Sequence, residues 1–192
     1  MDPLARLFGS FPRLKLLRLF LFNDDVSFTA ADASFRTKVT KDQARKEIAV
    51  LVAAGVVKKQ VKAGKGSFAL NKKFPHYESL QTFLRTSTNL SDTDVVSSLK
   101  RAGSLRLVVL TGMFTGSIES KIDLLVVGDR LEERPLENAV HALEAELGRE
   151  LRFTSFSTED FRYRLGVYDR LLRDVFDYPN RILLDKIGLS KN

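Results

Sequence analysis

The stretch GMFTGSIESKIDLLVVGD (residues 112–129) contains the residues whose types and spacing come nearest to an active site. Lys121 and Asp123 stand two apart in an apolar run typical of a strand, and strand residues two apart face the same way. Two carboxylates at this spacing could bind divalent metal ions, but one of the two positions is an amine. A lysine ammonium repels Mg²⁺ at short range, and Asp123 alone supplies too few oxygen ligands. We therefore expect no catalytic residue and no metal site here.

The composition limits other chemistry as well. The chain has no Cys, which excludes disulfides and thiolate metal sites, and its two isolated His residues are too few for a His-based zinc site. Apolar residues make up 44% of the 192 residues, enough for a packed core. We expect a globular protein without a cofactor.

Positive charge is concentrated in the first half of the chain. Residues 1–86 contain 16 Lys or Arg and 7 Asp or Glu, whereas residues 87–192 contain 15 and 17. This asymmetry predicts a basic binding module joined to a nearly neutral domain.

The apolar N-terminal run is interrupted by Arg6, Arg13, Lys15 and Arg18. These charges are too frequent for a membrane span, and a signal peptide needs a longer apolar core. We expect a cytoplasmic protein without a membrane partner.

The elements that would position the basic residues follow from local patterns. Pro12 opens a helix with apolar residues at helical spacing, a short helix follows at about 30–36, and Thr40 is a suitable N-cap for a third helix at about 41–54. VVKKQV (56–61) and SFALN (67–71) then flank the glycine turn AGKG (63–66), which predicts a β-hairpin. Three helices followed by a basic hairpin predict a winged helix-turn-helix over residues 1–73.

Ten polar or basic residues form the predicted DNA-binding set. Helix-turn-helix proteins place the start of the recognition helix in the major groove, and a hairpin can reach phosphates. Gln and Arg suit adenine and guanine edges, so Gln43 and Arg45 are the candidate base contacts. The alternative is that the lysines only solvate the surface, or that the module docks a protein. The set is Lys38, Thr40, Lys41, Gln43, Arg45, Lys46, Lys58, Lys59, Lys62 and Lys65.

Three segments in order, FGSFPRLKLLRLFLFN, RKEIAVLVAAGVVKK and GSFALNKKFPHYESLQTFL, resemble winged-helix transcriptional regulators of prokaryotes. The resemblance implies binding to double-stranded DNA, and a linker helix after the wing, which we place at residues 74–89. Because helix-turn-helix proteins often bind paired half-sites, it also implies a homodimer.

Residues 90–192 alternate between helical and extended patterns. A helix is expected at 92–101, strands at 105–112 and 121–128, a helix between Pro135 and Gly148, and a strand at 150–157. One helix with a buried stripe of Phe161, Leu165, Tyr168, Leu172 and Val175 should precede a last strand at 181–185. The order predicts a mixed sheet with helices on it, so the fold class expected for the whole chain is α+β.

The order of the predicted elements and the amino-acid sequence of residues 90–188 resemble the minimal nucleotidyltransferase domain of the polymerase-beta superfamily. The resemblance implies a Gly-Ser pair that binds triphosphate after the first strand, an Asp-apolar-Asp strand for two Mg²⁺, and a third carboxylate. Here Gly112 is followed by Met113, Lys121 replaces the first carboxylate, Asp123 matches the second, and strand 150–157 offers no aspartate. We expect a catalytically inactive member.

Two interpretations of this altered site remain. Lys121 could form a salt bridge to Asp123 or Glu119, or stay exposed to solvent. Alternatively Gly112, Met113, Lys121 and Asp123 could form a metal-free site for a nucleotide or another small anion.

The sequence as a whole predicts a DNA-binding transcriptional regulator whose second domain senses a ligand or aids assembly. Two rival functions stay open. One is an active or metal-free nucleotide-binding nucleotidyltransferase, with Asp129 or Glu119 completing the site. The other is an antitoxin-like module that binds a protein partner.

Overall fold

The computed structural model describes residues 3–62, 65–87, 90–116 and 119–189. The protein is mixed α+β and divides into two compact units. The first comprises residues 1–89 and 141–150, and the second comprises residues 90–140 and 151–192. None of the described helices has both the length and the apolar character that a membrane crossing needs.

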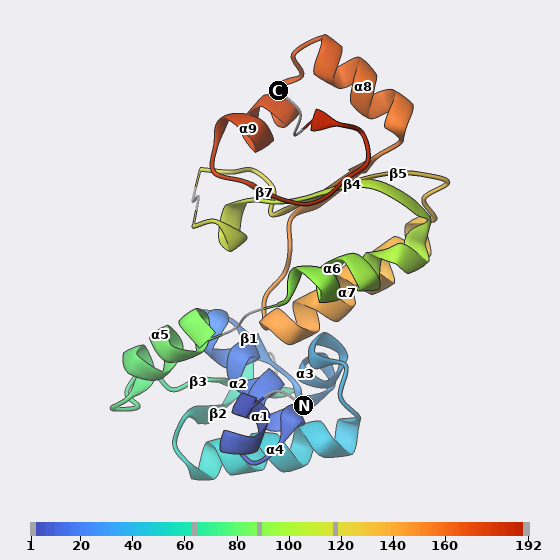
Figure 1. Ribbon diagram of the computed structural model, residues 1–192. Helices are drawn as coiled ribbons and strands as arrows, with labels where there is room; N and C mark the ends of the chain where they lie inside the picture. The colour runs from blue at the N-terminus through green and yellow to red at the C-terminus, as the bar shows by residue number, and fades with distance from the viewer. Residues whose placement is uncertain (1–2, 63–64, 88–89, 117–118, 190–192) are drawn as a thin grey trace. The chain divides into compact units, whose positions relative to one another are not determined.

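The first unit is a helical cluster with a small sheet (Figure 1). The sheet has the order β1-β3-β2 and is antiparallel throughout. Its elements are α1 (Pro3–Leu7), α2 (Phe11–Phe22), β1 (Ser27–Phe28), α3 (Ala30–Thr37), α4 (Lys41–Ala53), β2 (Val57–Lys62), β3 (Lys65–Leu70) and α5 (Tyr77–Ser87). The predicted helices and hairpin strands are confirmed, whereas α1 and the two-residue strand β1 were not predicted. The turn residues Ala63 and Gly64 lie outside the described residues.

An apolar core holds the first unit together. Leu14, Leu17 and Phe20 of α2 pack with Ile48 and Leu51 of α4. Burying such side chains stabilises a fold by about 1.5–3 kcal/mol each. This packing leaves the opposite face of α4 to solvent.

Residues 141–150 group with the first unit, although the predicted domain boundary placed all of residues 90–192 together. Polar contacts explain the grouping. Lys15 Nζ lies 2.7 Å from the Glu146 carboxylate, Arg18 donates to the Glu146 carbonyl, and Asn23 Nδ2 donates to the Gly148 carbonyl.

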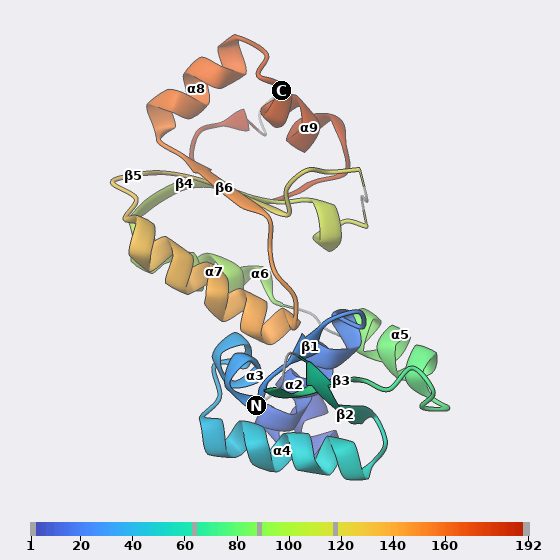
Figure 2. The same ribbon diagram turned by 180° about the vertical axis from the view of Figure 1, so that it is seen from behind.

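The second unit is built on a four-stranded sheet of order β6-β5-β4-β7. β4 (Ser104–Leu110) is antiparallel to β5 (Leu124–Asp129) and to β7 (Arg181–Asp185), and β6 (Phe153–Phe156) is parallel to β5. The second unit also contains the helices α6 (Asp92–Leu99), α8 (Thr158–Gly166) and α9 (Arg170–Asp177), and the short helices η1 (Lys100–Ala102) and η2 (Gly112–Phe114). The helix α7 (Glu133–Leu147) begins in this unit, and its residues from 141 onwards belong to the first unit. Figure 2 shows α8 and α9 on one face of the sheet and α6 on the other.

The prediction of a single helix between residues 157 and 178 is wrong, because the chain forms two helices, α8 and α9, with a break between them. Tyr168 adopts a left-handed conformation with φ of 54°, which a helix cannot include. Asp169 then accepts hydrogen bonds from the N–H groups of Leu171 and Leu172 and starts α9. Consequently Phe161, Leu172 and Val175 of the predicted stripe are buried, whereas Leu165 and Tyr168 are exposed.

Candidate nucleic-acid interface and the polar site at Asp123

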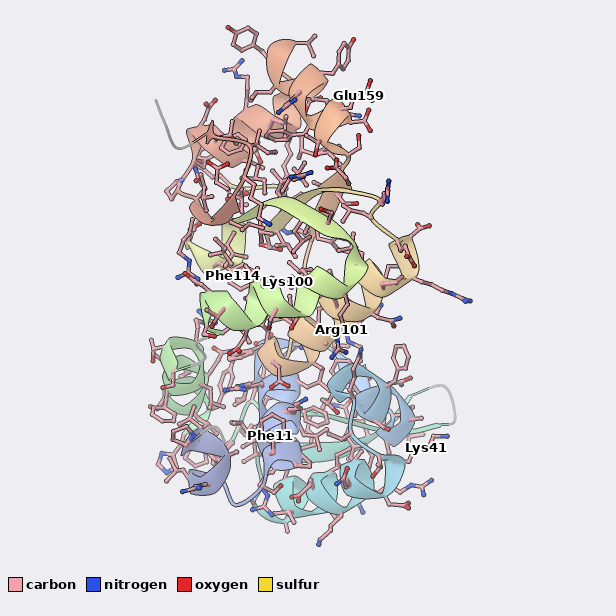
Figure 3. The ribbon with its side chains drawn as sticks, turned by 45° about the vertical axis from the view of Figure 1, so that its right-hand side comes forward. Phe11, Lys41, Lys100, Arg101, Phe114 and Glu159 are labelled. Carbon is pink, nitrogen blue, oxygen red and sulfur yellow. The ribbon has the colours of Figure 1, made fainter. Side chains whose placement is uncertain are left out.

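The junction between α3 and α4 is a short turn. Lys38 follows α3 with φ of 52°, and Thr40 begins α4 as its N-cap, so only three residues separate the two helices. Helix-turn-helix units use turns of this length. The turn exposes the first residues of α4, and Figure 3 marks Lys41 at that end of the helix.

The predicted DNA-binding residues of the turn and of α4 all lie at the surface. They are Lys38, Thr40, Lys41, Gln43, Arg45 and Lys46. The Arg45 guanidinium is 3.5 Å from the Asp42 carboxylate, and both side chains are largely exposed. Such exposed pairs contribute little to stability, so Arg45 can leave Asp42 for another anion at small cost.

Gln43 has a structural task that the sequence interpretation did not assign to it. Its side-chain oxygen accepts hydrogen bonds from the Thr40 N–H and hydroxyl, and Thr40 Oγ1 accepts from the Gln43 N–H. This reciprocal arrangement is a capping box. A bidentate contact to adenine needs the amide oxygen as well as the amide nitrogen. Gln43 therefore could contact adenine in this way only by giving up the cap, and Arg45 is the better base-contact candidate.

A buried carboxylate positions α4 within the first unit. Glu47 Oε1 accepts a hydrogen bond from the Ser10 hydroxyl at 2.8 Å, and Glu47 Oε2 accepts one from Arg13 Nε at 2.8 Å. Ser10 also accepts a hydrogen bond from the Arg13 N–H as the N-cap of α2. This network ties the buried side of α4 to the start of α2, so that the exposed face of α4 is held in one orientation.

The hairpin lysines do not form one face. Lys58 and Lys59 are both exposed, but they are successive residues of β2 and point to opposite sides of the strand. Lys62 and Lys65 are paired in register across the hairpin, and their side chains lie outside what the structure describes. At most one of Lys58 and Lys59 can therefore face a given DNA backbone.

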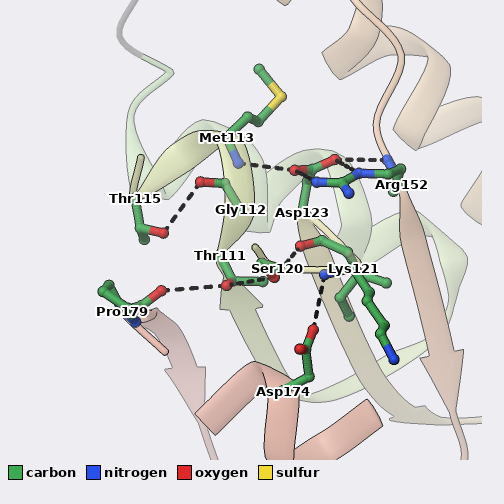
Figure 4. Close-up of polar contacts among 11 residues, drawn as sticks. Thr111, Gly112, Met113, Thr115, Ser120, Lys121, Asp123, Arg152, Asp174 and Pro179 are labelled. Carbon is green, nitrogen blue, oxygen red and sulfur yellow. Dashed lines mark hydrogen bonds and ion pairs between the residues drawn. The ribbon is translucent and has the colours of Figure 1, made fainter. Parts of the chain in front are cut away.

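In the second unit, Asp123 lies at the centre of a closed polar cluster (Figure 4). Its side chain is only 4% exposed. The carboxylate accepts four hydrogen bonds, two from Arg152 Nε and Nη2 at 3.0 and 2.9 Å and two from the backbone N–H groups of Met113 and Arg152 at 2.9 and 3.0 Å. Four donors on one carboxylate leave little capacity for a metal ion.

These contacts determine the ionisation state of the Asp123 carboxyl group. Burial by itself raises the pKa of the carboxyl, but the hydrogen bonds from Arg152 and from the backbone N–H groups outweigh it, and the pKa of Asp123 lies below its ordinary value. Asp123 is therefore an ionised partner of Arg152 at neutral pH. A guanidinium thus stands beside the carboxylate, where a metal site would need further oxygen ligands.

Gly112 is required by the close approach of Asp123. Its φ is 52°, and a Cβ atom at this position would lie 2.3 Å from Asp123 Oδ1 and 2.7 Å from the Ile122 carbonyl oxygen. Only glycine fits such a contact. The conformation also aims the next N–H, that of Met113, at Asp123 and away from any incoming phosphate.

Lys121 does not join this cluster through its side chain. The strand β5 begins at Leu124, so the expectation that Lys121 and Asp123 are strand residues on one face is wrong. The Lys121 N–H donates to Asp174 Oδ2 at 2.9 Å, and Figure 4 shows the side chain directed away from the Asp123 carboxylate. Of the two interpretations of Lys121, the geometry favours plain solvent exposure.

The two carboxylates considered for completing an active site interact with other residues. Asp129 lies at the far end of β5, where it accepts a hydrogen bond from Arg106 Nε at 2.8 Å. The negative charge of Glu119 raises the pKa of the Tyr178 phenol. Among the described residues, no group of three or more His, Asp or Glu side chains could hold a metal ion.

Sequence reasoning missed Arg152 and Asp174. Arg152 directly precedes β6, the strand that was searched only for a third carboxylate. An arginine at that point of the sequence was a usable signal, because it could neutralise the one remaining aspartate. Asp174 of α9 gives no such signal, since its contact with Lys121 depends on the tertiary fold.

Comparisons with known proteins identified no relative of this chain. No protein-family model, no curated protein and no solved structure matches this chain.

Proposed function

We propose that the protein is a DNA-binding transcriptional regulator. The first unit acts as a winged helix-turn-helix, with α3 and α4 as the helix-turn-helix pair and β2 and β3 as the wing. The second unit is a nucleotidyltransferase-like domain without catalytic activity that serves assembly or ligand sensing. The observation that supports this proposal best is the exposed start of α4, which presents Lys41, Arg45 and Lys46 next to a three-residue turn.

The charge distribution supports the same role. The excess of Lys and Arg lies in residues 1–86, which contain both α4 and the hairpin strands β2 and β3. DNA-binding modules need such an arrangement, because phosphate contacts supply affinity and base contacts supply specificity.

The absence of catalysis is proposed from the Asp123 cluster. A reaction with two Mg²⁺ ions needs several carboxylate oxygens, whereas Asp123 is bound to Arg152 and to two N–H groups. The metal-free anion site is not favoured either, because the Met113 N–H already donates to Asp123 and Lys121 points elsewhere.

Selection of bound fragments from a genomic DNA pool tests the proposal. We expect a common sequence to be enriched, and Arg45→Gln to weaken binding to it by about 1–3 kcal/mol if Arg45 contacts a guanine. Arg101→Gln is the matched control, since it removes an exposed guanidinium from η1 of the second unit (Figure 3). If no fragments are enriched, or if both variants weaken binding equally, the proposal fails.

A direct assay tests the proposal that the second unit has no catalytic activity. Incubation with labelled nucleoside triphosphates and Mg²⁺ should give no transfer product. Transfer that is lost on Asp123→Asn would show that the unit is an active enzyme.

A further inference from the structure

The exposed face of α4 carries one carboxylate among basic residues. From Lys38 to Lys46 the chain contains four Lys or Arg, and Asp42 is the only acidic residue. The Asp42 side chain is 94% exposed. A negative charge on a surface that is proposed to meet DNA phosphates weakens binding to every sequence. A repulsive group at such a place is physically useful when it contributes to specificity.

The fold itself does not require a carboxylate at this position. The capping box of Thr40 and Gln43 already provides side-chain partners for N–H groups at the start of α4. Asp42 Oδ1 lies 3.5 Å from Arg45 Nη1, and an ion pair as exposed as this one contributes little to stability. The favourable effect of an acidic residue in the first turn of a helix is similarly small.

The Asp42–Arg45 pair can present a defined pattern of polar groups to a ligand. The two residues are three apart on α4, so their side chains lie on the same face of the helix. A guanidinium has five N–H donors, and a carboxylate has about four acceptor positions. The pair can therefore remain in contact while further guanidinium donors and carboxylate lone pairs bind another molecule. That molecule must offer acceptors and a donor side by side.

The major-groove edge of a G·C base pair has this pattern. Guanine N7 and O6 are acceptors that suit an arginine, and the N4 amino group of cytosine is a donor that suits an aspartate. In the reverse orientation, a C·G pair would bring guanine acceptors against the carboxylate. An A·T pair would bring the adenine amino group, a donor, against the guanidinium. A linked guanidinium and carboxylate thus distinguish G·C from the other base pairs.

From these observations we infer that Asp42 and Arg45 together recognise one G·C base pair in the major groove, with Arg45 on the guanine and Asp42 on the N4 amino group of its cytosine. The inference rests on the proposed DNA binding and names the base pair that the first unit selects. It adds Asp42, an acidic residue, to a set of DNA contacts chosen for positive or neutral side chains.

Parallel selections from a random-sequence duplex library, with the full-length wild type, Asp42→Ala and Arg45→Gln, test the inference. The wild type should enrich a motif that contains a G·C pair, and the preference for this pair should be lower in both variants. Fluorescence anisotropy with the enriched duplex then measures the effect of exchanging G·C for C·G. The exchange should weaken the wild type at least about fivefold more than Asp42→Ala, because only the wild type brings a carboxylate against guanine acceptors.

Two controls separate this role from a general effect of charge. Glu78→Ala removes another exposed carboxylate of the first unit, from the first turn of α5, and should keep the wild-type discrimination between G·C and C·G. Inosine in place of the guanine keeps N7 and O6 but lacks the amino group in the minor groove. The wild type should therefore prefer I·C over C·G as it prefers G·C.

Two results would overturn the inference without contradicting the proposed function. One is an enriched motif for which Asp42→Ala discriminates between G·C and C·G as strongly as the wild type. The other is a preference that disappears with inosine, which would place the contact in the minor groove. If the wild type enriches no motif, the proposed function fails and the inference fails with it.

Discussion

At the scale of single residues, Asp123 and Arg152 determine what the second unit can do. The carboxylate is buried, ionised and satisfied by four hydrogen bonds, two of them from the guanidinium. An aspartate in this state is a structural anchor between β5 and the start of β6. It follows that changes at Asp123 or Arg152 should alter the stability of the protein.

Replacing Arg152 by Gln should make stability depend differently on pH. Because the pKa of Asp123 is lowered in the folded protein, the pair stabilises the fold above the unfolded Asp pKa of about 3.9, and this stability is lost as the pH falls through the lower folded value. Without the guanidinium, only the two backbone N–H groups oppose the effect of burial, so the pKa of Asp123 is higher than in the wild type. We expect Arg152→Gln to lower the free energy of unfolding by about 1–3 kcal/mol at pH 7, and the loss to shrink towards pH 3.

Urea denaturation at several pH values measures this difference. Arg162→Gln on α8 removes an exposed guanidinium without a carboxylate contact of this kind and should change stability by no more than about 0.5 kcal/mol. A loss for Arg152→Gln that is equal at pH 7 and pH 3 would contradict the assigned role of the pair.

Two glycines of the loop after β4 should respond very differently to alanine. Both have positive φ, 52° for Gly112 and 75° for Gly116, but a Cβ at Gly112 meets Asp123 while a Cβ at Gly116 meets no atom within 4 Å. Gly116→Ala should cost about 1–2 kcal/mol for the backbone conformation alone. Gly112→Ala should cost roughly 2–5 kcal/mol, because overpacking adds to that term. Equal shifts in the urea midpoint would show that the contact with Asp123 is unimportant.

At the scale of secondary structure, the start of α4 serves both folding and binding. The capping box formed by Thr40 and Gln43 satisfies N–H groups that would otherwise lack partners at the helix start. The same residues lie at the end of α4 that is proposed to enter the DNA groove. The two roles can be separated by substitutions at Gln43.

Gln43→Ala should lower the free energy of unfolding by about 0.5–1 kcal/mol, because half of the box is lost. Gln43→Glu should retain stability, since a Glu at this position completes the same box. On DNA, Gln43→Glu should weaken binding, because it adds a negative charge near phosphates. Thermal unfolding and anisotropy of the two variants make the comparison. A stability loss for Gln43→Glu as large as that for Gln43→Ala would rule out the capping role.

The sequence predicted those elements whose signals are local. Thr40 as an N-cap, the buried face of α4 and the strands of the hairpin follow from patterns within a few residues, and the structure confirms them. The break at Tyr168 was missed because its helical apolar spacing outweighed the start signal of Asp169. Arg152 was missed because its partner Asp123 is 29 residues away in the chain, and such a pairing depends on the parallel register of β5 and β6.

At the scale of the whole molecule, the two units differ in net charge. The first unit, residues 1–89 and 141–150, contains 17 Lys or Arg and 10 Asp or Glu, whereas the second contains 14 of each. The first unit can therefore release counterions from DNA, and the second has no general attraction to phosphate. Under the proposed function, this division assigns affinity for DNA to the first unit.

The dependence of DNA affinity on salt tests this division most directly. Fluorescence anisotropy with one duplex over a series of salt concentrations gives the slope of log affinity against log salt. We predict a steep negative slope whose magnitude falls by about one unit in the double variant Lys58→Gln and Lys59→Gln, because only one of these two lysines can face a given DNA backbone. The control, Lys100→Gln with Arg101→Gln in η1, should keep the wild-type slope. An affinity independent of salt, or the same change of slope in both double variants, would contradict the assignment of DNA binding to the first unit.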